Sequence, residues 1–249
     1  LDKCLFRQIE ENPSYALWAK DYDVPEYITD NLHPDKKLRE YQINAVKHFI
    51  WLYEQDRARA KHLLFNMATG TGKTLVMAAC VLYLYDKGYR NFIFLVHRDQ
   101  ILKQAEKNFT DYKFEKYLFN PAGVRINGRR VGIGIIQSIA DTSRDEINFL
   151  FVSQQTLVNS LSEDKENSLT AEDFASNDIV IIADEAHSLN ADTRSKNKAE
   201  ATEARHWETS VLSTLAMREG NILLEFTATV DLANKNIHKK YEDRLVYRY

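Results

Sequence analysis

Cysteine, proline and glycine are all scarce in this 249-residue chain, which contains two cysteines, four prolines and eight glycines. Two distant cysteines, Cys4 and Cys80, exclude a disulfide-rich framework and a zinc site that needs several closely spaced ligands. So little proline and glycine excludes a low-complexity or linker-dominated chain. Cys80 lies within an apolar run, which predicts a buried thiol, and we expect a reducing, cytoplasmic environment.

Long apolar runs and a strong charge of one sign are also missing. No run approaches the roughly 20 apolar residues that span a bilayer, and the charged Leu1–Glu10 shows no secretory pattern. We therefore expect no membrane partner. The formal net charge is −3, which argues against a protein that coats nucleic acid indiscriminately but is compatible with a local basic groove.

What the chain does contain is an alternation of strands and helices. Short, almost wholly apolar runs predict strands that are buried on both faces, and helical patterns follow several of them. We predict strands at His62–Asn66, Asn91–Val96, Val124–Ile126, Val131–Ile136, Ile147–Val152, Ile179–Ala183 and Leu223–Phe226, with helices from Leu38, over Lys73–Asp86 and over Asp99–Phe109. This order predicts an α/β fold: a mostly parallel sheet with helices on both faces.

Three stretches fall outside this alternation. Residues 1–37 contain several X-Pro breaks and predict a lead-in segment with some helix. Ser162–Asn177 is acidic and polar, and Ala191–Arg205 has almost no large apolar residues. Both are typical of a surface loop or an exposed helix. We divide the chain into the lead-in over 1–37 and one larger domain over 38–249.

A glycine-containing turn between a predicted strand and a predicted helix carries the strongest functional signal. Residues Gly70–Thr74 read Gly-Thr-Gly-Lys-Thr, in the context that a Walker A loop requires, although Met67 replaces the usual first glycine. Glycines let backbone N–H groups face phosphate oxygens, and the helix N-terminus adds its positive dipole end. Lys73 would reach the β- and γ-phosphates, and Thr74 would place its hydroxyl on Mg²⁺. The predicted nucleotide-binding residues of this loop are Met67, Ala68, Thr69, Gly70, Thr71, Gly72, Lys73 and Thr74.

An acidic pair follows the predicted strand Ile179–Ala183. The carboxyl ends of parallel strands are where such sheets bind ligands, and Asp184 and Glu185 come at that point. Asp184 can hold Mg²⁺, directly or through water, and Glu185 can orient or deprotonate an attacking water. We therefore predict Lys73, Asp184 and Glu185 as catalytic residues, with ATP and Mg²⁺ as cofactors. His187 either bridges this site to a neighbouring segment or simply packs.

These motifs resemble those of superfamily 2 helicases and translocases. Met67–Thr74 resembles their motif I, Asp184–His187 their DEAH box, and Thr227–Thr229 their motif III. Leu38–Gln42 is similar to their glutamine motif, in which Gln42 would read adenine through its amide. The resemblance implies a RecA-like P-loop domain that binds and hydrolyses ATP.

Three further runs narrow the resemblance to the restriction (Res) subunit of type III restriction enzymes. They are Arg125–Gly128, His206–Thr209 and Leu223–Thr229. That family implies ATP-driven movement along double-stranded DNA and a modification (methyltransferase) subunit as a partner. Phosphate contacts from loops at strand ends suit a motor that ignores sequence. On this resemblance, the DNA-contacting or coupling residues are His97, Arg98, Gln154, Gln155, His187, Thr227 and Thr229.

The resemblance also implies parts that this chain does not carry. A superfamily 2 motor needs a second RecA-like lobe for its arginine finger, and a type III enzyme adds a nuclease. About twenty residues follow Thr229, too few for a second lobe. Glu163–Lys165, the nearest match to a nuclease motif, lies in a polar loop. We expect a first motor lobe of a longer protein, which binds ATP and hydrolyses it slowly by itself.

Other functions stay open at the level of sequence. The same motor serves repair, phage defence and RNA remodelling in superfamily 2, and a nucleotide-binding module without turnover would share the motifs. A P-loop kinase would need a lid and an acceptor pocket, and a transporter ATPase a Ser-Gly-Gly signature, and neither pattern occurs. The intact Lys73, Thr74, Asp184 and Glu185 argue against a decayed site.

Overall fold

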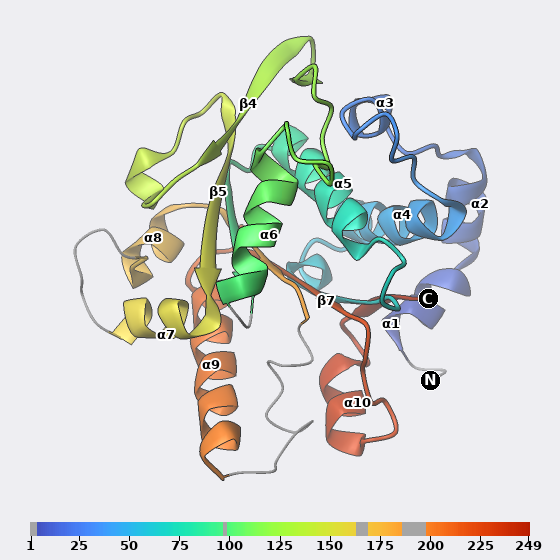
Figure 1. The fold of residues 1–249 in the computed structure, drawn as a ribbon. Coiled ribbons are helices and arrows are strands. Elements are labelled where there is room, and N and C mark those ends of the chain that lie inside the picture. The colour runs from blue at the N-terminus through green and yellow to red at the C-terminus, as the bar shows by residue number, and fades with distance from the viewer. Residues whose placement is uncertain (1–3, 97–98, 163–168, 186–197) are drawn as a thin grey trace.

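The computed structural model describes residues 4–96, 99–162, 169–185 and 198–249. Within these ranges, eight strands form one sheet in the order β3-β4-β5-β2-β6-β7-β1-β8 (Figure 1). The strands are β1 (His62–Asn66), β2 (Asn91–Val96), β3 (Val124–Ile126), β4 (Arg129–Ile135), β5 (Glu146–Ser153), β6 (Ile179–Ala183), β7 (Ile222–Thr227) and β8 (Leu245–Arg248).

Every pairing in the sheet is parallel except that of β3 with β4. The carboxyl ends of the parallel strands therefore lie at one common edge, where an α/β sheet binds its ligands. The predicted fold class, a mostly parallel sheet in an α/β domain, is confirmed. Strand β4 begins at Arg129, two residues earlier than predicted, because the antiparallel turn from β3 pairs Arg129 with Ile126.

Helices cover both faces of the sheet (Figure 1). They are α1 (Leu5–Glu10), α2 (Pro13–Asp21), α3 (Glu26–Thr29), α4 (Glu40–Gln55), α5 (Lys73–Asp86), α6 (Asp99–Thr110), α7 (Gln154–Ser162), α8 (Ala171–Ser176), α9 (Lys198–Met217) and α10 (Lys235–Tyr241). Two short 3₁₀ turns are present: η1 (Arg59–Lys61) lies between α4 and β1, and η2 (Ile139–Asp141) lies between β4 and β5.

The strand β2 shows why an unbroken apolar run becomes a central strand. Phe92 and Phe94 belong to the buried cluster that includes residues of α4, α5 and α6. Ile93 and Leu95 face the other way, into the cluster that includes residues of α7, α8 and α9. Because alternate side chains point to opposite faces, both faces are buried only if every position is apolar.

The helix α5 starts directly after the glycine turn and forms the centre of the larger cluster. Nearly all of its side chains are buried, including Cys80, which confirms the predicted buried thiol. A helix that is apolar all round must be enclosed on all sides. Here β1 precedes it, α4 and α3 pack beside it, and the sheet lies beneath it. The start of α5, and with it the glycine turn, is therefore held firmly.

Residues 4–37 form three short helices, in agreement with a lead-in that contains some helix. The helices α1, α2 and α3 contribute Leu5, Tyr15 and Ile28 to the same buried cluster as the sheet. The backbone N–H of Leu5 also donates to the carbonyl of Glu242, 2.6 Å away. This segment packs against the larger domain, and the division of the chain at residue 37 stays a prediction.

The polar segment predicted as a surface loop or an exposed helix contains two buried side chains. Within Ser162–Asn177 the structure forms the short helix α8, which confirms the helical alternative for Ala171–Ser176. Leu169 and Phe174, however, are buried against the sheet face that α9 also covers. Sequence patterns missed these two contacts, because Leu169 and Phe174 are the only large apolar residues in an otherwise polar segment.

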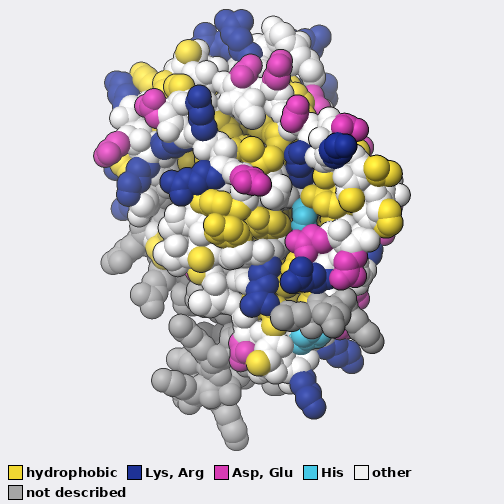
Figure 2. All heavy atoms as spheres, turned by 90° about the vertical axis from the view of Figure 1, so that its right-hand side faces the viewer, with side chains coloured by type: hydrophobic (Ala, Val, Ile, Leu, Met, Phe, Trp, Pro, Cys, Tyr) yellow, Lys and Arg dark blue, Asp and Glu magenta, His cyan; other side chains and the backbone are white. Residues whose placement is uncertain are grey.

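The surface carries charges of both signs. Figure 2 shows Lys and Arg side chains interspersed with Asp and Glu over the face turned to the viewer. This mixture agrees with the small net charge, and the part of this face that is described offers no broad basic tract. Among the helices of the described ranges, none has the length and apolar content needed to cross a bilayer.

We expect Phe174→Ala to lower the free energy of unfolding by about 3–5 kcal/mol, because it opens a cavity under α8. Glu172→Ala, at an exposed position of the same helix, is the matched control and should change stability by less than about 0.5 kcal/mol. Urea denaturation followed by circular dichroism measures both. Equal unfolding midpoints would show that α8 does not depend on this anchor.

Candidate nucleotide-binding site

The sheet order brings three predicted motifs to the same place. The phosphate loop Met67–Thr74 follows β1, the acidic pair follows β6, and Thr227–Thr229 begins at the end of β7. Strand β7 lies between β1 and β6. All three segments therefore leave the sheet at its carboxyl edge within the width of three neighbouring strands.

The phosphate loop is held in a tight turn by its glycines and by Thr71. Gly70 and Gly72 have φ angles of +81° and +77°, in the left-handed region that favours glycine. The Thr71 hydroxyl donates to the carbonyl of Ala68 across 2.7 Å. Helix α5 begins at Lys73, so the N–H groups of its first turn have no carbonyl partners within the helix. Such a turn is suited to hold phosphate oxygens.

Lys73 connects the phosphate loop to the acidic strand end. Its side chain is 8% exposed, its Nζ donates to the Met67 carbonyl at 3.4 Å, and it lies 3.8 Å from Oε1 of Glu185. A buried ammonium needs such oxygen partners, because desolvation without them is costly. The two residues predicted to act on phosphate and water are thus already adjacent.

The acidic pair sits in a strained and desolvated turn. Desolvation, together with the Glu185 carboxylate and against the opposing effect of Lys73, raises the pKa of Asp184 to about 6. One Asp184 oxygen accepts a hydrogen bond from the Glu185 backbone N–H at 2.9 Å. Glu185 itself has a φ of +54°, unusual for a residue with a side chain. Strain of this kind clusters at functional sites.

Gln42 contacts the phosphate loop directly. Its Nε2 donates to the carbonyls of Thr71 at 2.8 Å and Gly72 at 3.3 Å, and its Oε1 accepts from the Arg39 backbone N–H at 2.8 Å. Both amide protons are therefore used within the protein, and Gln42 acts here as a brace for the loop. The prediction that it reads adenine stays a prediction, and it would require at least one of these bonds to be exchanged.

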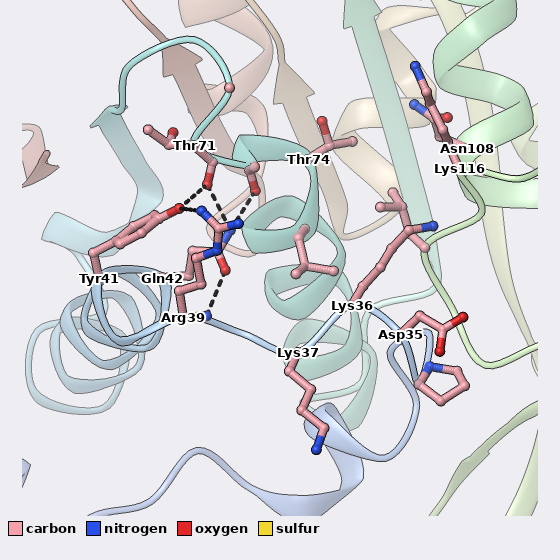
Figure 3. Close-up of a pocket in the computed structure, with 15 residues that line it drawn as sticks. Asp35, Lys36, Lys37, Arg39, Tyr41, Gln42, Thr71, Thr74, Asn108 and Lys116 are labelled. Atoms are coloured by element: carbon pink, nitrogen blue, oxygen red, sulfur yellow. Dashed lines mark hydrogen bonds between the residues drawn. The ribbon is translucent and has the colours of Figure 1, made fainter.

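A cleft of about 620 Å³ opens beside the brace, a size typical of small-ligand pockets. Figure 3 shows Tyr41 and Gln42 joined to the loop by hydrogen bonds, with Lys36 and Lys116 on another side of the cleft. The lining residues are Pro34, Asp35, Lys36, Lys37, Arg39, Tyr41, Gln42, Gly70, Thr71, Gly72, Thr74, Leu75, Asn108, Lys116 and Leu118. The cleft lies between the phosphate loop and residues 34–42, which include the glutamine motif Leu38–Gln42.

Several of these residues carry no sequence signal. Lys36 donates to the carbonyls of Glu115 and Tyr117 and so ties two lining loops together. Tyr41 donates to Thr71 O at 3.0 Å and stacks on Tyr249 with ring centroids 4.1 Å apart. Tyr41 stands beside Gln42 in its motif and was within reach of prediction. The contacts of Lys36 with Tyr117 and of Tyr41 with Tyr249 could not be predicted, because these partners lie about 80 and 200 residues away in the chain.

The predicted DNA-contacting residues are only partly described. Gln154 and Gln155 begin α7 at the carboxyl end of β5, and Gln155 is exposed and donates to Asn159 at 2.9 Å. Thr227 closes a turn, since its hydroxyl donates to the Thr229 carbonyl at 3.0 Å. Their DNA and coupling roles stay predictions. His97, Arg98 and His187 lie outside the described residues.

The residues that would hold Mg²⁺ suit that ion in their chemistry. Thr74 offers a hydroxyl and Asp184 a half-buried carboxylate, both hard oxygen donors. The described residues contain no group of three or more His, Cys, Asp and Glu side chains that could hold a metal. Mg²⁺ in nucleotide sites needs only one or two carboxylates besides substrate phosphates, so this small donor set fits it.

The sheet order and the phosphate loop define a RecA-like nucleotide-binding lobe. The UvsW helicase of bacteriophage T4 has a similar fold, with a TM-score of 0.52 and 14% identity, over 96% of this chain and 67% of that one. At this identity the likeness concerns the fold alone.

Sequence comparison gives the family. The family described as "Type III restriction enzyme, res subunit" matches residues 35–232. The probable type III restriction-modification enzyme HindVIP Res subunit of Haemophilus influenzae is 34% identical over 278 aligned positions, which cover all of this chain and 53% of that protein. The chain belongs to the family of type III restriction enzyme Res subunits. It spans about half the length of this curated relative.

We expect Asp184→Asn to stabilise the nucleotide-free chain at pH 7.5. The pKa of Asp184 is raised from 3.8 to about 6, so native stability falls as the pH rises through this window and stays reduced above it. A shift of about two pKa units limits the gain in the free energy of unfolding to about 3 kcal/mol. Such a gain would raise the melting temperature by several degrees. Thermal melts from pH 4 to 8 measure the gain, which should vanish near pH 4. Asp243→Asn, at an exposed carboxylate, should show no such trend.

The two loop glycines make a second, paired prediction. A Cβ added at Gly72 would lie 2.5 Å from Nε2 of Gln42, whereas one at Gly70 would meet nothing within 4 Å. Both substitutions carry the left-handed backbone cost of about 1–2 kcal/mol. Gly72→Ala should therefore destabilise the nucleotide-free chain more than Gly70→Ala in urea unfolding. An equal loss would mean that Gln42 yields without cost and is not a brace.

Proposed function

We propose that this chain is the ATP-binding first motor lobe of a type III restriction subunit, a translocase that moves along double-stranded DNA. The observation that carries the proposal is the contact between Lys73 and Glu185. It brings a phosphate-binding loop and a carboxylate at the end of β6 into one site, an arrangement that suits ATP hydrolysis. Family membership supports the restriction role.

The site residues divide the work of hydrolysis between them. Backbone N–H groups of Gly70–Thr74 and the Lys73 ammonium would hold the phosphates. Glu185 would orient and deprotonate the attacking water. Mg²⁺ bound through Thr74 and Asp184 would supply charge neutralisation at the phosphates. A longer protein would provide the arginine finger in a second RecA-like lobe, which alone can raise the rate by about 10³–10⁵.

The partners follow from the family and stay proposals. The related HindVIP subunit is named as part of a restriction-modification enzyme, which supports a modification subunit as partner. A DNA contact through Gln155 is supported by its exposed place at the carboxyl edge of the sheet. The alternatives are a superfamily 2 motor in repair, phage defence or RNA remodelling, and a module that binds nucleotide without turnover.

We expect Lys73→Ala to weaken Mg·ATP binding by this chain at least about tenfold, because charge-assisted bonds to phosphate are lost. Isothermal titration calorimetry measures the affinity, and Lys103→Ala, at an exposed lysine of α6, is the matched control. Titrations with GTP test the preference for adenine. No binding of Mg·ATP by the unaltered chain would refute the proposal.

Glu185→Gln separates binding from turnover. In the longer protein it should leave ATP affinity within about threefold and lower DNA-stimulated hydrolysis at least about a hundredfold, because the general base is lost. Unchanged hydrolysis would favour a binding module, and stimulation by RNA alone would favour the RNA-remodelling alternative.

A further inference from the structure

A buried amide ties the phosphate loop to the segment that ends β7. Asn66 is the last residue of β1, directly before Met67, and is 7% exposed. Its Nδ2 donates to two carbonyls of the neighbouring segment, those of Thr227 at 3.3 Å and Ala228 at 3.2 Å. The sequence patterns gave this residue no role.

The backbone around Asn66 strengthens the same connection. The Met67 N–H donates to the Thr227 carbonyl at 2.9 Å, so that carbonyl accepts from both the Asn66 side chain and the Met67 backbone. The Thr227 hydroxyl accepts from the Thr229 N–H at 3.2 Å and donates to the Thr229 carbonyl at 3.0 Å, which closes the turn. The phosphate loop and the Thr227–Thr229 turn thus share one hydrogen-bonded junction.

The Ala228 carbonyl is the contact that backbone pairing does not supply. The strand pairing of β1 with β7 ends at Asn66 and Thr227. Beyond this point the two chains separate, one into the phosphate loop and the other into the turn. Besides the Met67 N–H bond to the Thr227 carbonyl, the Asn66 side chain bridges them by reaching the Ala228 carbonyl, and its primary amide has two protons for two carbonyls.

We propose that Asn66 is the positioning residue through which the phosphate loop and the Thr227–Thr229 turn move together. A shift of the loop on nucleotide binding would reach the turn through the Nδ2 bonds, and a shift of the turn would reach the loop in the same way. The part of this inference that concerns a polynucleotide partner of the turn rests on the proposed function. The hydrogen-bonded link between the loop and the turn does not.

Asn66→Asp tests the tie with almost no change in size. A carboxylate has no proton to donate and would face two carbonyl oxygens, so the junction opens. In the longer protein, we expect the polynucleotide stimulation of ATP hydrolysis to fall about tenfold, with ATP affinity changed by less than about threefold. Asn66→Gln, which keeps the two donors, should restore part of the stimulation.

Asn221→Asp is the matched control at the other end of β7. Asn221 is buried, and its Nδ2 also donates to two carbonyls, those of Phe174 and Thr214 at 2.9 Å each. Loss of that amide should cost comparable stability and leave the stimulation ratio unchanged. If both variants lower basal and stimulated rates alike, Asn66 only supports the fold and the proposal is overturned.

Hydrogen–deuterium exchange on this chain tests the tie without any activity. Asn66→Asp should speed exchange in the peptide that covers 67–72 and in the one that covers 227–229. Asn221→Asp keeps the Oδ1 acceptor for the Ile179 N–H and loses the Nδ2 bonds to Phe174 and Thr214, so it should speed exchange only around those two residues. Unchanged exchange at 227–229 would overturn the proposal. Absence of ATP hydrolysis by the longer protein would refute the proposed function alone, since the exchange experiment does not depend on hydrolysis. If the Asn66→Asp variant is too unstable to measure, Asn66→Ser replaces it and is expected to give the same pattern of exchange.

Discussion

Parallel pairing of β1 with β7 and of β7 with β6 is the constraint on which the whole site depends. It aligns Asn66 with Thr227 and Ala183 with Glu225, so three segments leave the sheet side by side. Below this edge the rings of Phe65 and Phe226 stack with centroids 4.5 Å apart. A one-residue slip would turn every side chain to the opposite face, so this buried aromatic pair helps to fix the register that assembles the nucleotide site.

The site concentrates features that are uncommon in the described core. Most core side chains are apolar, although Glu225 of β7 is buried against His62, whereas the site partly buries the carboxylate of Asp184, holds Glu185 in a left-handed conformation and places oxygen atoms around Lys73. Each of these features is unfavourable for a folded chain considered alone. Together they place charge where a phosphorylated ligand would need it, and α5 provides the rigid base that tolerates them.

Sequence patterns predicted the central strands because burial on both faces leaves an almost unbroken apolar run, as in Ile179–Ala183. They missed β8 and α10, since a four-residue edge strand and a lysine-rich seven-residue helix carry too few periodic positions. At the site, motif spacing predicted the loop and the acidic pair. It could not predict the contacts of Gln42 or Asn66, because these depend on which distant segments the sheet brings together.

The oxygen partners of Lys73 have a consequence for how the loop chooses among anions. Because a carbonyl and a carboxylate already surround the ammonium, an incoming ligand must displace an internal competitor. A ligand that also engages the backbone N–H groups of the loop would offset this exchange more fully than one that contacts the ammonium alone. The contact of Lys73 with Glu185 would therefore make the affinity of the loop depend on how many of its N–H groups a ligand reaches.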